Sequence, residues 1–95
     1  MVYRQGHLAR DVQELAGTSA RFSRNLVGAV LEALRRAIRR GDRVALPRLG
    51  TFRTVRVERH RTHLPDGRIV EVPTYYRVVF EPSEVLKREL RCEDE

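Results

Sequence analysis

The 95-residue chain has a single cysteine, no tryptophan and only six phenylalanine and tyrosine residues. The lone Cys92 excludes an internal disulfide framework, and its position in a polar tail marks it as an incidental thiol. With so few aromatic residues, the core must consist mainly of Leu, Val, Ile and Ala, and a chain of this length buries only a small core. We therefore expect one domain over residues 1–95 whose interior is completed by dimerisation.

The chain also lacks any long apolar run. No segment approaches the roughly 20 apolar residues that span a bilayer, and the N-terminus does not show the basic-then-apolar order of a signal peptide. We expect a cytoplasmic protein that does not bind membranes and does not take a small-molecule substrate.

Motifs of enzymes are missing as well. The sequence has no glycine-rich phosphate loop, no Gly-x-Ser-x-Gly and no plausible set of nucleophile, base and orienting group. His7, His60 and His63 show no metal-ligand spacing with the cysteine or with a cluster of acidic residues. We therefore expect no enzymatic activity, no cofactor and no bound metal.

Positive charge is plentiful. The 19 basic residues outnumber the 13 acidic ones, for a net charge of +6, and all but Lys87 of the basic residues are arginine. Three of the acidic residues form the tail Glu93-Asp94-Glu95, so the preceding residues carry +9. Such a body favours polyanions, nucleic acid above all, and arginine suits bidentate phosphate contacts.

The first half of the chain has helical periodicity. Leu8, Val12 and Leu15 predict a helix from about Arg4 to Ala16, which ends at Gly17. Thr18 and Ser19 offer the next N-cap, and a longer helix runs to about Arg40. Its apolar stripe is broad enough to contact both its own sheet and a partner subunit. Residues 1–41 are thus the predicted helical dimerisation part.

The second half is predicted to form strands and a short last helix. Residues 43–80 form a sheet with a long hairpin whose tip lies at about 63–67, and Val70, Val72, Thr74, Tyr76, Val78 and Phe80 alternate on one face of the return strand. Residues 82–91 form the C-terminal helix, with Pro82 in its first turn. The predicted fold class is α+β: two N-terminal helices, a three-stranded antiparallel sheet with a hairpin arm, and a C-terminal helix.

The hairpin from Leu49 to Pro73 is rich in arginine and has Pro65 at its tip. Arginines on a narrow two-stranded ribbon can reach phosphates on both walls of a minor groove, whose base pattern is degenerate. The ribbon therefore predicts largely sequence-tolerant binding to double-stranded DNA that bends easily or is already distorted.

Three stretches then point to a family: Gly41-Asp42-x-Val44-x-Leu46, Gly50-Thr51-Phe52 and Val78-Val79-Phe80-x-Pro82-Ser83-x-x-Leu86-Lys87. With them, nearly the whole chain resembles the HU and integration host factor family of bacterial histone-like DNA-bending proteins. The resemblance implies an intertwined dimer, either a homodimer or a heterodimer, associated with the nucleoid. It also implies two arms that wrap the duplex, each with a proline that wedges between base pairs.

On this resemblance, Pro65 matches the intercalating wedge and Gly67 the glycine of the turn. The DNA-binding residues that we expect are Arg53, Arg56, Arg59, Arg61, His63, Pro65, Arg68, Arg77 and Lys87.

The sequence departs from the family pattern at several positions. The tip His63-Leu64-Pro65-Asp66-Gly67 is one residue shorter between proline and glycine, and Leu64 offers a second wedge. Arg48 replaces the first glycine of a Gly-Phe-Gly turn, while Glu71 and Glu84 stand where basic residues are common. These changes bear on the depth of the kink more than on the fold.

Alternative interpretations remain open at the level of sequence. The chain could be a site-preferring subunit like those of integration host factor, an RNA-binding protein, or a dimerisation module whose arm contacts protein. Arg35, Arg36, Arg39 and Arg40 could form a second DNA-facing patch or simply a solvated helix end.

Overall fold

The computed structural model describes residues 1–91, so Cys92 and the acidic tail Glu93-Asp94-Glu95 lie outside the described residues. Two helices come first, then five strands, then a short helix. The chain divides into two compact units, Met1–Ala37 and Ile38–Glu95. None of the helices described is both long and apolar enough to cross a membrane.

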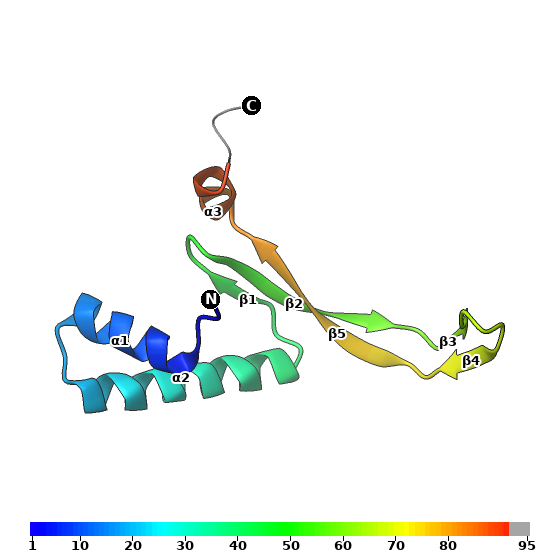
Figure 1. Ribbon diagram of the computed structural model, residues 1–95, viewed down its shortest axis with the longest axis horizontal. Coiled ribbons are helices and arrows are strands. Elements are labelled where there is room, and N and C mark those ends of the chain that lie inside the picture. Colours follow the sequence, from blue (N-terminus) through cyan, green and yellow to red (C-terminus); the bar gives the residue numbers. More distant parts are fainter. Residues whose placement is uncertain (92–95) are drawn as a thin grey trace. The chain divides into compact units, whose positions relative to one another are not determined.

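The helical unit is formed by α1 (Gln5–Ala16) and most of α2 (Ala20–Arg39), which Figure 1 shows as an antiparallel pair. Helix α1 ends at Gly17 in the left-handed conformation, and the Gly17 N–H donates to the Gln13 carbonyl over 2.9 Å. The Ser19 hydroxyl accepts from the Phe22 N–H over 3.1 Å, as an N-cap does. Both predicted helices and the cap between them are confirmed.

The interior of this unit is small. Only Ala9, Ser23 and Val27 are buried in the two helices, and the Ser23 hydroxyl is hydrogen-bonded to that of Thr18 over 2.6 Å. By contrast, Phe22, Leu26 and Val30, spaced four residues apart on α2, are 54%, 41% and 49% exposed. A helix face that is apolar and exposed in one chain is available to a second surface.

The second unit contains all the strands. Strands β1 (Val44–Leu46), β2 (Gly50–Val57) and β5 (Tyr75–Pro82) form an antiparallel sheet in the order β1-β2-β5. Strands β3 (His60–His63) and β4 (Ile69–Val72) pair in a separate two-stranded sheet at the far end of the β2–β5 ribbon (Figure 1). The predicted three-stranded sheet with a long hairpin arm is confirmed.

One detail of the predicted return strand is wrong. Tyr76, Val78 and Phe80 do share a face, but the strand is interrupted at Pro73 and Thr74, between β4 and β5. The outgoing strand is interrupted opposite, at Glu58 and Arg59. Pro73 has no N–H to donate to the ladder, and the Arg59 N–H instead donates to the Thr74 hydroxyl over 3.1 Å. An alternating pattern alone does not reveal this break.

The last helix begins later than predicted. Helix α3 spans Glu84–Glu89, and Ser83 is its N-cap, with its hydroxyl accepting from the Leu86 N–H. Pro82 belongs to β5, where it pairs with Gly50. The Ser83 N–H donates to the Leu49 carbonyl over 3.0 Å, so the chain remains tied to the sheet until the cap. A serine cap therefore starts this helix in place of a proline in the first turn.

The turn between β1 and β2 holds an unusual backbone. Arg48 has a φ of 68°, and it is the one residue other than glycine with positive φ among those described. The adjacent Leu49 N–H donates to the Leu46 carbonyl over 3.1 Å and closes the turn. This is the position at which the sequence departs from the glycine of the family pattern, so the backbone keeps a glycine-like conformation with an arginine.

Candidate nucleic-acid interface

The arm of the second unit is built by two successive ladders. In the first ladder, β2 pairs with β5 over eight residue pairs from Gly50↔Pro82 to Val57↔Tyr75. In the second, β3 pairs with β4 from His60↔Val72 to His63↔Ile69. We call residues 58–74, which include the break and the β3–β4 hairpin, the distal arm. The pairing brings residues distant in sequence, such as Arg61 and Glu71, directly opposite each other.

The proposed DNA-binding arginines occupy both faces of the β2–β5 ribbon. Arg77 is paired with Val55, and Arg53 lies two residues before Val55 on β2, so Arg53 and Arg77 lie on one face. Arg56 is opposite Tyr76 on the other face. A thin ribbon with cations on both sides can contact two walls of a groove at once.

Most arginines of the arm have a carboxylate partner within the arm or its base. Arg53 is bonded to Glu81, Arg56 lies 2.9 Å from Glu58, Arg61 lies 3.4 Å from Glu71, and Arg68 lies 2.6 Å from Asp66. Arg59 and Arg77 have no ion pair with any carboxylate of residues 1–91. The side chains in these pairs are largely exposed, so each pair adds little stability and can exchange for a phosphate.

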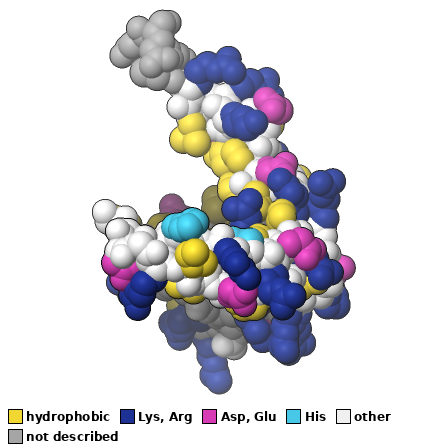
Figure 2. All heavy atoms as spheres, turned by 90° about the vertical axis from the view of Figure 1, so that its right-hand side faces the viewer, with side chains coloured by type: hydrophobic (Ala, Val, Ile, Leu, Met, Phe, Trp, Pro, Cys, Tyr) yellow, Lys and Arg dark blue, Asp and Glu magenta, His cyan; other side chains and the backbone are white. Residues whose placement is uncertain are grey.

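The distal arm is formally neutral when its histidines are neutral. Its cations are Arg59, Arg61 and Arg68, and its anions are Glu58, Asp66 and Glu71. Viewed from the side of the tip in Figure 2, carboxylate side chains are interspersed among those of arginine. The positive charge that the sequence suggested for the whole hairpin therefore belongs to the β2–β5 ribbon, whose three cations Arg53, Arg56 and Arg77 outnumber its one carboxylate, Glu81.

Glu81 is held ionised at the base of the arm. The hydrogen bond from Arg53 is the main cause that lowers the pKa of Glu81, and the nearby charges of Arg53, Arg43 and Lys87 act in the same direction. Arg53 thus faces a carboxylate that stays charged at neutral pH. Contact of Arg53 with a phosphate requires that this ion pair be shared or opened.

The tip forms a closed turn. The Leu64 N–H donates to the Arg68 carbonyl over 2.8 Å, and the Gly67 N–H donates to the Leu64 carbonyl over 2.9 Å. Gly67 has a φ of 90°, the conformation that follows the turn in three-residue hairpin loops. Pro65 is exposed, while Leu64 is half-buried. The structure thus presents Pro65, and not Leu64, as the more accessible apolar side chain of the turn.

Two further predicted positions lie beside these elements. His63 is the last residue of β3, is exposed and pairs with Ile69. Lys87 lies in the last turn of α3, where its ammonium is 3.5 Å from Glu84. Glu84, which stands where basic residues are common in the family, is therefore also the ion-pair partner of Lys87.

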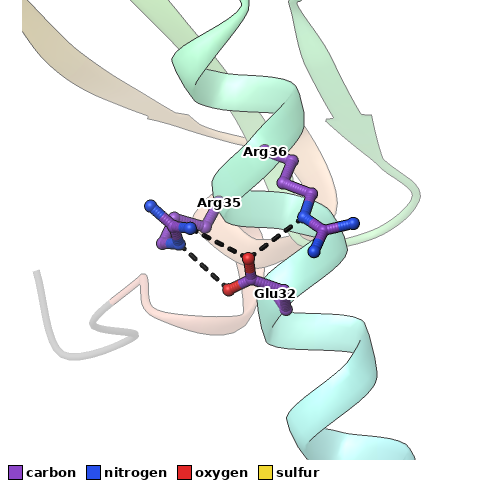
Figure 3. Close-up of polar contacts among 3 residues, drawn as sticks. All are labelled: Glu32, Arg35 and Arg36. Carbon is purple, nitrogen blue, oxygen red and sulfur yellow. Dashed lines mark hydrogen bonds and ion pairs between the residues drawn. The ribbon is translucent and has the colours of Figure 1, made fainter.

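The arginines at the end of α2 are also engaged by carboxylates. Glu32 accepts hydrogen bonds from Arg35 and Arg36, as Figure 3 shows, and these bonds lower the pKa of Glu32 to about 2. In the second unit, Arg40 lies 2.7 Å from Asp42. The pairs of Glu32 with Arg35 and Arg36, at i, i+3 and i, i+4, are typical of a solvated helix surface, while Arg40 and Asp42 lie just past the end of α2. The pairs of Glu32 favour that interpretation over a second DNA-facing patch.

Sequence reasoning missed the ion pairs between the arm arginines and neighbouring carboxylates. Glu58 follows Arg56 by two residues, a spacing that puts side chains on the same side of an extended strand. Asp66 precedes Arg68 by two in a Pro-Asp-Gly turn, where an aspartate often bonds the backbone two residues on. Both spacings were available signals. The pair of Arg61 with Glu71 could not be found in this way, because it depends on the strand register.

Among residues 1–91, no group of three His, Cys, Asp or Glu residues could hold a metal ion.

Comparison with known proteins places these features in context. A family model described as bacterial DNA-binding protein matches residues 4–91. The fold is similar to that of Anabaena HU in a cocrystal structure with DNA, with a TM-score of 0.81 and 22% sequence identity. That similarity covers 92% of this chain and 96% of the other. No curated protein matches the chain.

Proposed function

The chain belongs to the bacterial DNA-binding protein family, as its sequence resemblance indicated, and on this premise we propose that it is an architectural protein that bends duplex DNA. In this proposal a dimer grips the minor groove with two arms and binds largely without sequence specificity. Its place in the cell is the nucleoid. Its role is binding and shaping of DNA, with no chemical step.

The observation that carries the proposal is the exposed Pro65 in a closed turn at the end of a two-stranded ribbon. A ribbon can enter a minor groove that bending has widened, and an apolar side chain at its end can enter between base pairs. Unstacking costs about a few kcal/mol per step, which contacts along the bent duplex offset. The Anabaena relative, whose fold this chain shares, was crystallised with DNA, which supports the same use of the arm.

We assign the phosphate contacts to the arginine, lysine and histidine side chains along the ribbon and beside it. These residues are Arg53, Arg56, Arg59, Arg61, His63, Arg68, Arg77 and Lys87. The exposed ion pairs to neighbouring carboxylates hold several of these cations in place before DNA arrives. Because such pairs are weak in water, a phosphate can replace the carboxylate at small cost.

The proposed dimer is supported by apolar side chains that one chain leaves uncovered. Phe22, Leu26 and Val30 line one face of α2, and a hollow of about 160 Å³ lies beside them among Leu8, Val12 and Val27. On β5, Val78 is 55% exposed and Phe80 is 40% exposed. A second copy would bury these surfaces. Only two hydrophobic side chains of the described part, Ala9 and Val27, are buried within one chain, so a partner would enlarge the core.

The binding mode can be tested by fluorescence anisotropy on one duplex, intact and nicked, across a salt series. A nick lowers the cost of kinking, so we expect tighter binding to the nicked form and a steep loss of affinity with salt. Salt-steep binding without preference for the nick would retain the basic arm and reject the wedge. Stronger binding to a double-stranded RNA of the same sequence would reject the DNA assignment.

The wedge itself can be tested by end-to-end energy transfer on the same duplex. We expect Pro65→Ala to bind DNA but to bend it less than the wild-type protein. Equal bending by both proteins would reject Pro65 as the wedge. Sedimentation of the purified chain at micromolar concentration tests the dimer, and a folded monomer there would overturn it.

A further inference from the structure

Asp66 makes two contacts with a single residue of the tip turn, Arg68, two residues further along the chain. Its Oδ1 accepts a hydrogen bond from the Arg68 backbone N–H over 3.1 Å, and its Oδ2 accepts one from the Arg68 Nε over 2.6 Å. Asp66 follows Pro65 directly, and the Leu64 and Arg68 backbones close the turn around both residues. The carboxylate therefore ties the residue next to the wedge to the strand that leaves the tip.

This carboxylate stands in an unfavourable place for DNA binding. At the tip of an arm that approaches phosphates, a negative charge repels the ligand and also neutralises Arg68. Asp66 and Arg68 are 52% and 74% exposed, so their ion pair is worth little by its charge. The hydrogen bond to the backbone is a different kind of contact, since aspartate side chains that bond backbone two residues on define turns.

We propose that Asp66 is a positioning residue that holds Pro65 in one orientation for entry between base pairs. The inference rests on the proposed wedge role of Pro65. A turn fixed before binding loses less conformational freedom when the wedge enters the stack. The chain thus gives up some phosphate attraction at the tip in return for a preorganised wedge. The tip is one residue shorter between proline and glycine than the family pattern. The two hydrogen bonds from Arg68 to Asp66, which we call the Asp66 clamp, keep this short turn closed.

The proposal predicts that replacement of Asp66 reduces DNA bending without reducing DNA affinity. Asp66→Ala removes a negative charge and frees Arg68, so we expect DNA affinity to stay the same or to rise by up to about fivefold, the value of one exposed ion pair. Bending should fall at least halfway from the wild-type value towards that of Pro65→Ala. Asp66→Asn keeps an oxygen that can accept from the Arg68 N–H, and it should bend DNA more than Asp66→Ala does.

A matched control is available in the same unit. Asp42 is also 52% exposed and also pairs with an arginine two residues away, Arg40, but it lies outside the arm. Asp42→Ala therefore removes the same charge and the same type of ion pair without touching the tip. It should leave bending at the wild-type value. A reduction as large as that of Asp66→Ala would overturn the proposal, because charge alone would then explain the effect.

The experiment measures affinity by anisotropy and bending by energy transfer for the full chain, with Asp66→Ala in the wild-type and the Pro65→Ala backgrounds. If Asp66 acts through Pro65, it should have no further effect on bending once Pro65 is replaced. Wild-type bending by Asp66→Ala, together with reduced bending by Pro65→Ala, would overturn the clamp and keep the wedge. Unchanged bending by both single variants would overturn the wedge and the clamp together.

Discussion

Gly50 lies against the ring of Phe80, so that a β carbon added at Gly50 would come within 2.7 Å of two ring carbons and would also collide with the Glu81 carbonyl. Phe80 is paired with Phe52 in the ladder, and their ring centroids are 4.9 Å apart. Gly50 is buried and has a φ of 154°. The absence of a side chain at this position is thus what allows β2 to pass the aromatic pair.

We therefore expect Gly50→Ala to lower the free energy of unfolding by about 2–3 kcal/mol, the usual cost of overpacking at a closed site. Gly6→Ala is the matched control, because a β carbon at Gly6 meets nothing within 4 Å and the residue lies in α1. That variant should be as stable as the wild type or up to about 1 kcal/mol more stable. Urea denaturation at one fixed protein concentration measures both, and equal stability of the two variants would contradict the account.

Arg48→Gly is expected to stabilise the protein. Arg48 has a φ of 68°, and a side chain in this left-handed region costs roughly 1 kcal/mol. Glycine adopts the conformation freely, although it also gains freedom in the unfolded chain. We expect a net rise of up to about 1 kcal/mol in the free energy of unfolding. Arg43→Gly, just before β1, should give no such rise, and a loss of stability in Arg48→Gly would show that the arginine side chain supports the turn.

Arg59 is expected to contribute a full phosphate contact, because it has no ion pair with any carboxylate in residues 1–91. Arg59→Ala should weaken binding to unrelated duplexes by the same factor and flatten the log–log salt slope by about 0.9. Arg10→Ala on α1 removes an equal charge far from the arm in sequence and serves as the control. An unchanged slope in Arg59→Ala would mean that the distal arm does not contact phosphates.

Glu71→Gln should have the opposite effect. Glu71 lies 3.4 Å from Arg61 and directly opposite it in the β3–β4 ladder, so its removal frees one cation of the neutral distal arm. We expect DNA affinity to rise by up to about fivefold and the salt slope to steepen by up to about 1. Anisotropy across a salt series measures both, with Glu14→Gln on α1 as the comparison. Weaker binding by Glu71→Gln would indicate that the ion pair is needed to hold the hairpin in register.

The carboxyl group of Glu32 should titrate at about pH 2 in the folded protein, well below its usual 4.5, because Arg35 and Arg36 donate hydrogen bonds to it. Since the pKa is lowered by folding, the stabilisation is complete above about pH 4.5 and is lost as the pH falls towards 2. Carboxyl carbon NMR measures the midpoint directly. Replacement of Arg35 and Arg36 by glutamine should return it towards 4.5, and a wild-type midpoint near 4.5 would refute the contact.

The local elements of the fold could be predicted from the sequence, since they depend on neighbours in the chain. The spacing of Leu8, Val12 and Leu15, the stop at Gly17 and the Ser19 cap are local signals, and α1 and α2 follow from them. The turn at Pro65-Asp66-Gly67 was equally readable. The interruption of the arm was not, because it involves a hydrogen bond from Arg59 to Thr74, 15 residues further along the chain. The place of Pro82 in β5 was not readable either, because it depends on pairing with Gly50.

The charge of the arm shows what the sequence by itself determined and what only the tertiary structure decided. Composition fixed the excess of arginine and hence the preference for a polyanion. Which arginines are available was decided by strand register and turn geometry, which bring Glu71 to Arg61 and Asp66 to Arg68. A net charge is a sum over residues and needs no fold, whereas an ion pair needs two atoms within a few ångströms, and for Arg61 and Glu71 only the folded hairpin provides that distance.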